Sequence, residues 1–140
     1  MYKRQKNDRV IDEKHGALSP QFGFTVAPGH IVYRHSICAV CQDGHIVPAG
    51  AKDSASVIVA VAGIARHQQS DRDTGYVDCM KACFALPFDT KPSWADVGKP
   101  VYAIDDETVT LTETGSDGKR LRVGVLAGIE IDGTPFVTVG

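Results

Sequence analysis

From residue 31 to the C-terminus, the chain alternates short apolar runs with turn-forming residues. Residues 109–112 and 121–125 place apolar and polar or small side chains in strict alternation, which is the two-residue period of a half-buried strand. Residues 56–62 (SVIVAVA) are apolar on both faces, as expected for a strand covered on two sides. These patterns predict an all-β domain.

Turn signals recur about every 8–12 residues, which is typical of a small β-barrel or sandwich rather than of βαβ units. Asp43-Gly44 and Asp132-Gly133 provide the positive φ of tight hairpins. Residues 75–86 are expected to form one strand with a bend near Ala82-Cys83. Ser93 and Gly98 predict one short helical turn near residues 93–97. The sequence shows no convincing internal repeat.

The N-terminal 28 residues lack this pattern. Val10 and Ile11 are the only aliphatic residues among the first 16, and Pro20 and Pro28 interrupt the stretch that follows. Such a segment cannot bury enough apolar surface by itself to offset its ordering entropy. The sequence therefore predicts an extended arm over residues 1–28, held by a partner, followed by a β domain over residues 29–140.

Composition and charge narrow the class of partner. The chain has 140 residues, of which 43% are hydrophobic and 23% charged, and its net charge is −2, so neither nucleic acid nor a membrane surface is an expected partner. It lacks both an apolar run of about 20 residues and a secretory signal, which favours a reducing cytoplasm. Residues 1–14 hold five basic and three acidic residues, against ten and fourteen in the remainder. A weakly basic arm thus precedes a weakly acidic body.

The four cysteines are candidate zinc ligands. Cys38-x-x-Cys41 and Cys79-x-x-x-Cys83 could supply four thiolates. However, residues three apart on a strand face opposite sides, and the second pair would lie roughly 13 Å apart. We expect packed free thiols, with metal ligation as the alternative, and no cofactor.

The other candidate chemistry is weaker. The histidines are not accompanied by a recognisable nucleophile motif, and the acidic residues 105–107, Glu113 and Asp117 lack calcium-loop spacing. We therefore expect no enzymatic activity. Trp94 fits a core position and an interface anchor equally well. The histidines are His15, His30, His35, His45 and His67.

From about residue 29 onward, the chain resembles the capsid cement, or head decoration, proteins of tailed bacteriophages. The resemblance implies a non-enzymatic protein, assembled in the host cytoplasm, that binds the outer capsid surface of the virion, commonly as a homotrimer, and clamps major capsid protein subunits. The family often has Gly where Cys83 precedes Phe84. The segments that carry the resemblance are DGHIVPAG, SVIVAVAGIA, GYVDCMKACFALP, WADVGKPVYAIDDETVTLT and RVGVLAGIEIDGTPFVTVG.

The arm lies largely outside this resemblance, so its role is a hypothesis from its own residues. Its apolar side chains could anchor it on the capsid or on a neighbouring copy, while its cations could pair with acidic capsid surface. The alternative is a β-sandwich that binds host-surface carbohydrate, or another virion head or tail component. The predicted contact residues are Tyr2, Lys3, Arg4, Lys6, Arg9, Val10, Ile11, Phe22 and Phe24, with Trp94 as a further candidate anchor.

Overall fold

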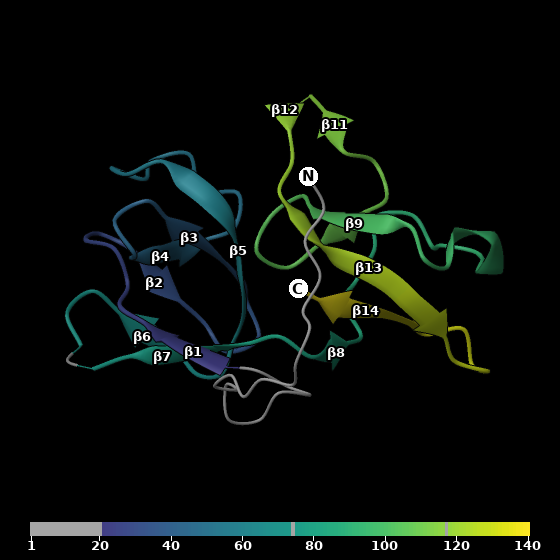
Figure 1. Cartoon of the computed structure of the whole chain (residues 1–140), viewed down its shortest axis with the longest axis horizontal. Helices are drawn as coiled ribbons and strands as arrows, with labels where there is room; N and C mark the ends of the chain where they lie inside the picture. Colours follow the sequence, from purple (N-terminus) through teal and green to yellow (C-terminus); the bar gives the residue numbers. More distant parts are fainter. Residues whose placement is uncertain (1–20, 74, 117) are drawn as a thin grey trace, which may run out of the picture.

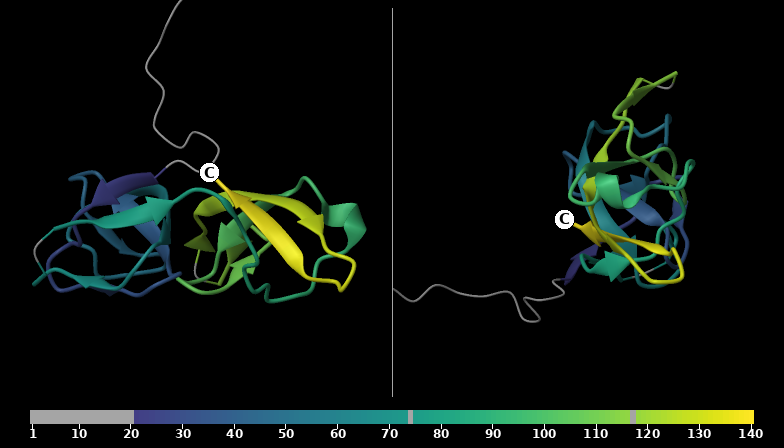
Figure 2. Two further views of the ribbon diagram at one scale, coloured as in Figure 1. Left: turned by 90° about the horizontal axis from the view of Figure 1, so that it is seen from below. Right: turned by 90° about the vertical axis from the view of Figure 1, so that its right-hand side faces the viewer.

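The alternating segments form strands in the computed structural model, which describes residues 21–73, 75–116 and 118–140. The described chain consists of short antiparallel strands and one 3₁₀ turn. The predicted all-β class is therefore confirmed, and the short turn predicted near residues 93–97 is present as η1 (Trp94–Asp96). The strands lie in two groups, one from each half of the chain, which sit side by side (Figure 1, Figure 2).

The first half is a five-stranded antiparallel sheet in the order β1-β7-β5-β3-β4, with a small β2-β6 ladder beside it. The sheet closes on itself, because Val26 bridges Ile46 in parallel. The Ala27 N–H donates to the Ile46 carbonyl and the Ile46 N–H to the Thr25 carbonyl, both at 2.9 Å. The strands are β1 (Gln21–Phe24), β2 (Ile31–Val32), β3 (Ile37–Cys41), β4 (Ile46–Pro48), β5 (Ile58–Ala65), β6 (Gln69–Ser70) and β7 (Val77–Met80).

The second half is another five-stranded sheet, in the order β10-β9-β13-β14-β8, with the small β11-β12 hairpin beside it. It closes in the same way, because Phe88 bridges Val109 in parallel. The Val109 N–H donates to the Pro87 carbonyl at 2.9 Å. The strands are β8 (Cys83–Phe84), β9 (Pro100–Ala103), β10 (Val109–Thr110), β11 (Thr114–Gly115), β12 (Gly118–Lys119), β13 (Arg122–Ile129) and β14 (Pro135–Val139).

The two sheets repeat one topology. In each, the first strand pairs with the last, the last with an eight-residue strand, that strand with the second, and the second with the third. The eight-residue strand carries a register shift beside a glycine in both copies, where Cys38 pairs with Gly63 and Val101 pairs with Gly124. The structure therefore contains an internal duplication that the sequence did not reveal.

Buried side chains fill equivalent positions in the two halves. At four of five such positions the first barrel has the smaller residue, such as Ala65 for Leu126, and only Ile46 is larger than its equivalent, Val109. The equivalent pairs are Cys38 and Val101, Ile46 and Val109, Ala62 and Val123, Ala65 and Leu126, and Cys79 and Val137. What is conserved between the halves is burial and strand position rather than residue identity, so comparing letters could not find the repeat.

Side chains from the first half also contribute to the buried core of the second half. Ile37, Ala49 and Ile64 come from the first half, yet they belong to the same buried cluster as Leu126 and Val137. β3 and β5 therefore have one face toward their own barrel and another toward the second sheet. The two-sided burial predicted for residues 56–62 is wrong for most of that segment, because Val57 and Val59 are 63% and 58% exposed, and β5 is buried on both faces only from Ala62 to Ala65. Because they share this cluster, the halves should behave as one folding unit.

The structure corrects two predicted boundaries. Residues 21–24 form β1, and Val26 and Ala27 are buried, so the predicted arm boundary at residue 28 falls inside the first barrel. The alternation of Phe22 and Phe24 with Gly23 suits a strand paired with β7. Secondly, the single strand predicted over residues 75–86 is divided, because β7 ends at Met80 in the first half and β8 begins the second.

One residue of the first half, His35, has a strained backbone conformation where the second half has a glycine. His35 has φ +68°, a left-handed conformation that is uncommon outside glycine, and its N–H donates to the Ala65 carbonyl at 2.8 Å. Gly98 holds the equivalent position, with φ +91° and a 2.8 Å bond from its N–H to the Leu126 carbonyl. The same turn is thus made once with glycine and once with histidine.

We expect His35→Gly to stabilise the protein by about 0.5–1 kcal/mol, because the left-handed strain is relieved although glycine gains entropy in the unfolded chain. The matched variant Gly98→Ala should lower stability by about 1 kcal/mol. Urea unfolding measures both changes. A loss of stability in His35→Gly would show that the imidazole contributes more than its backbone strain costs.

Candidate interaction surfaces

Trp94 lies on the surface of the second half. Its side chain is 68% exposed on the η1 turn, so the core position considered from the sequence is wrong. It borders a groove of about 320 Å³ whose lining includes Cys83, Ile129 and Phe136. Monomeric proteins tolerate single exposed apolar residues, but an indole beside further apolar side chains is typical of an interface anchor.

The turn that carries Trp94 is held by a small polar network. The Asp96 carboxylate accepts hydrogen bonds from the Ser93 N–H at 2.9 Å and the Lys99 ammonium at 2.8 Å. The Lys99 ammonium, followed by the Ser93 N–H, holds the pKa of the Asp96 carboxyl below its ordinary value. The Gly98 N–H ties the turn to β13 through the Leu126 carbonyl. The indole is therefore presented on a preorganised turn.

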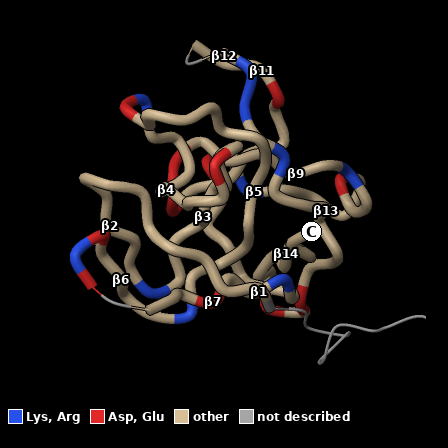
Figure 3. Tube along the Cα trace, turned by 60° about the vertical axis from the view of Figure 1, so that its left-hand side comes forward, with Lys and Arg blue, Asp and Glu red and all other residues tan. Residues whose placement is uncertain are grey.

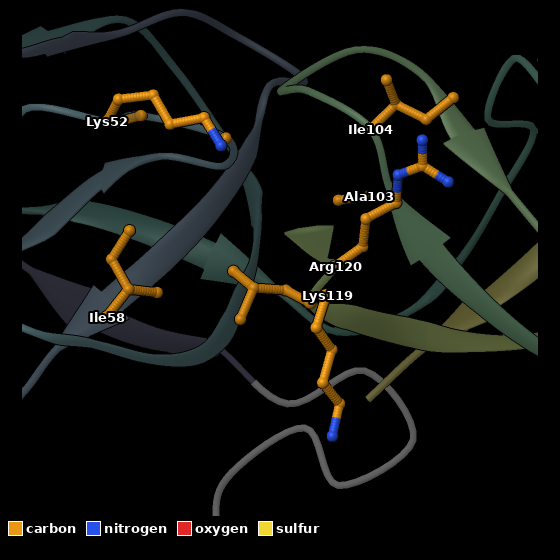
Figure 4. Close-up of a pocket in the computed structure, with 9 residues that line it drawn as sticks. Lys52, Ile58, Ala103, Ile104, Lys119 and Arg120 are labelled. Carbon is orange, nitrogen blue, oxygen red and sulfur yellow. The ribbon is translucent and has the colours of Figure 1, made fainter. Parts of the chain in front are cut away.

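A second surface feature lies where the two halves meet. A pocket of about 190 Å³ is lined by residues that follow β4, begin β5, end β9 and precede β13. Its apolar side includes Ile58 and Leu121, which pack on a cluster of buried residues. In Figure 4, the Lys52 side chain extends from the first half, the Arg120 guanidinium lies on the opposite side near Ile104, and Lys119 points away from both. The pocket is thus apolar inside with cations around it.

The cysteines occupy separate environments. Cys38 and Cys79 are buried in the first barrel, Cys41 belongs to another buried cluster and Cys83 is exposed. All four are free thiols, and in the described parts of the chain no group of three or more potential ligands is placed to hold a metal. The four thiols that the zinc alternative needs do not come together.

Burial and pairing change the acidity of two thiols. A hydrogen bond with Cys79, then burial, raises the pKa of Cys38 above its ordinary value, and burial, then the nearby Asp43 carboxylate, raises the pKa of Cys41. A thiol whose pKa is higher in the folded than in the unfolded state stabilises the fold at pH values below the unfolded-state pKa, which is near 9. This stabilisation is lost as pH rises above that value. High pH should therefore favour unfolding.

We expect stability to fall above pH 9, with Cys38 contributing roughly 1–2 kcal/mol of the loss by about pH 10.5. Cys38→Val should reduce this loss, because valine cannot ionise and Val101 fills the equivalent position. Urea unfolding of both proteins at pH 7, 9 and 10.5 makes the comparison. Equal alkaline losses would contradict a buried Cys38 thiol.

The histidines and the acidic run serve local structure where they are described. Thr25 Oγ1 lies 2.7 Å from His45 Nδ1, and His30 Nε2 lies 3.8 Å from the Asp53 carboxylate. Asp105 accepts the N–H groups of Glu107 at 2.8 Å and Thr108 at 2.7 Å, which closes the β9–β10 turn. His15 and Asp117 lie outside the described residues. Charges of both signs are spread over the loops of the two halves (Figure 3).

The three predicted contact residues that the structure describes do not form one site. Phe22, 44% exposed, and Phe24, half-buried against the first barrel, lie on β1. Trp94 lies on the η1 turn, which is the green coiled ribbon at the outer end of the second half in Figure 1. The cations around the pocket were missed, because Lys52, Lys119 and Arg120 come from distant segments and share no motif. The remaining arm residues, Tyr2, Lys3, Arg4, Lys6, Arg9, Val10 and Ile11, lie outside the described residues.

Comparison of the chain with protein-family models, curated proteins and solved structures finds no match. Among the described residues, no helix has the length and apolar character that crossing a membrane requires. The surfaces above are therefore the basis for a proposal of function.

Proposed function

We propose that the chain is a structural decoration protein that binds the outer surface of a tailed-phage head and stabilises contacts between major capsid protein subunits. The observation that carries the proposal is Trp94, a largely exposed indole on a turn fixed by Ser93, Asp96 and Lys99. The sequence resemblance supplies the class of partner. We expect the protein to act as a homotrimer on the virion surface after assembly in the host cytoplasm.

The fold suits a role in binding. Two closed sheets joined through one buried cluster provide a rigid support, so an exposed side chain can meet its partner without first ordering a loop. Tryptophan buries a large area with few rotatable bonds and is enriched among the residues that dominate binding energy. Trp94 and the groove beside it are therefore the contact that we assign to the capsid.

The proposed mechanism is mass action. A protein that binds only the assembled shell lowers the free energy of that state by an amount set by its concentration and affinity. Each copy need contribute little, since the same contact repeats over the shell. The chain would thus strengthen heads without taking part in a chemical reaction.

We expect Trp94→Ala to weaken binding to heads roughly 30-fold, which corresponds to the loss of a hot spot of about 2 kcal/mol. Co-sedimentation of the purified chain with heads that lack it measures the change, using heads of the phage that carries its gene. Tyr76→Ala is the matched control, because Tyr76 is 69% exposed but lies in the first half.

Equal binding by wild type and Trp94→Ala would remove Trp94 from the interface. If wild type does not sediment with heads but binds a glycan array, and Trp94→Ala abolishes that binding, the carbohydrate alternative would replace the present proposal.

A further inference from the structure

The pocket between the two halves combines two kinds of surface. Its apolar side is formed by Ala51, Ile58 and Leu121, which pack against the buried residues of the cluster containing Val47. Because these side chains are fixed by that packing, the pocket does not depend on a partner for its shape. It offers apolar contact to a side chain that enters it.

The charged side chains that line the described part of the pocket are all cationic. Three of its lining residues, Lys52, Lys119 and Arg120, are cationic, and none of the described lining residues is acidic. The Lys119 ammonium lies 3.8 Å from the Glu113 carboxylate in an exposed pair, and Arg120 donates to the Thr112 carbonyl at 3.0 Å. From residue 15 onward the chain has more acidic than basic residues. The cationic lining of the pocket therefore differs in sign from the net charge of this part of the chain.

We propose that this pocket binds an acidic peptide segment of a partner protein, with an apolar side chain inserted between the halves and flanking carboxylates facing Lys52 and Lys119. Charge complementarity favours an anionic partner, and the apolar side of the pocket favours one that also carries an aliphatic group. The lining residues that the structure describes include no aromatic side chain on which a nucleic-acid base could stack. A protein segment therefore fits both surfaces better than nucleic acid does.

The pocket is distinct from the Trp94 groove, and its test does not require phage heads. The probe is the N-acetylated, C-amidated peptide Asp-Leu-Glu-Asp-Leu-Glu, titrated into the ¹⁵N-labelled full chain at low salt. We expect backbone shifts at residues 50–52, 58, 103–104 and 119–121, and binding that weakens as salt rises. The Asn/Gln version of the peptide should bind at least tenfold more weakly.

The variant Lys52→Glu/Lys119→Glu should also lower affinity at least tenfold, and both side chains are exposed, so the fold should be kept. Arg72→Glu is the control, because Arg72 is an exposed cation in a first-half loop away from the pocket lining.

Shifts elsewhere, no detectable shifts, or equal binding by the double variant would overturn the proposal. Equal affinity for inorganic phosphate would reduce the pocket to a simple anion site, and preference for a single-stranded oligonucleotide would assign it to nucleic acid.

Discussion

Gly124→Ala is expected to destabilise the protein by roughly 3–5 kcal/mol, a large part of the stability of an ordinary domain. Gly124 lies on β13 opposite Val139. A β-carbon there would overlap the Thr138 carbonyl oxygen, lie 2.8 Å from its carbonyl carbon and lie 3.1 Å from the Val139 Cα. These are backbone atoms of a paired strand, so relief requires β13 and β14 to separate.

The matched control for this effect is Gly128→Ala on the same strand. A β-carbon at Gly128 would meet nothing within 4 Å, and alanine restricts the unfolded chain more than glycine does. Its stability should stay within about 1 kcal/mol of wild type. Thermal unfolding followed by circular dichroism distinguishes the two variants, and equal stability would show that β13 and β14 are not packed as described.

Gly63 makes the same close backbone approach in the first half. It stands at the equivalent position, with φ +142°, and a β-carbon there would lie 2.7 Å from the Met80 carbonyl oxygen. In both halves the eight-residue strand thus approaches the last strand too closely for a side chain, next to a register shift. The repeated glycine is a structural requirement of the duplicated fold.

Ile64→Ala is expected to cost about 2–5 kcal/mol and to lower the stability of both halves together. Ile64 is fully buried on β5, yet it belongs to the cluster that contains Leu126 and Val137 of the second sheet. Trimming it leaves a cavity between the halves, so the loss cannot be confined to the first barrel. Val59→Ala on the same strand is the control, because Val59 is 58% exposed and should change stability by no more than about 0.5 kcal/mol.

Two probes follow the halves separately in the Ile64→Ala experiment. Reactivity of the buried thiols Cys38, Cys41 and Cys79 reports the first half, since the exposed Cys83 reacts before unfolding, and fluorescence of Trp94, the single tryptophan, reports the second. We expect one transition, with both probes shifting to the same lower urea concentration. If only the buried-thiol signal shifts, the two halves unfold independently and do not share a core.

The sequence predicts the local structure of the second half well, since the alternation over residues 109–112 and 121–125 leads directly to β10 and β13. The turn at Trp94 was also predictable, because Ser93 and Gly98 mark its ends. In contrast, residues 75–86 appear as one run, and only tertiary pairing assigns β7 and β8 to different sheets. Local periodicity specifies a strand but does not specify its partner.

The candidate sites were less predictable. Trp94 was ambiguous because its neighbours give the same pattern for a core and for an interface position, and exposure in the folded chain decides between them. The pocket cations could not be predicted because Lys52 comes to line the same pocket as Lys119 and Arg120 only when the two halves pack together. His35 gives no signal in sequence either, and its strain is recognised through comparison with Gly98.

The resistance of phage heads to disruption is the measurement that tests the proposed function most directly. Heads assembled without the chain are heated, or exposed to chelator or osmotic shock, and DNA release is followed with a fluorescent dye, with and without added purified chain. We expect heads without the chain to assemble but to release DNA at a lower temperature, wild type to restore resistance, and Trp94→Ala to restore less. Heads that resist equally well without the chain would contradict the role in capsid stabilisation.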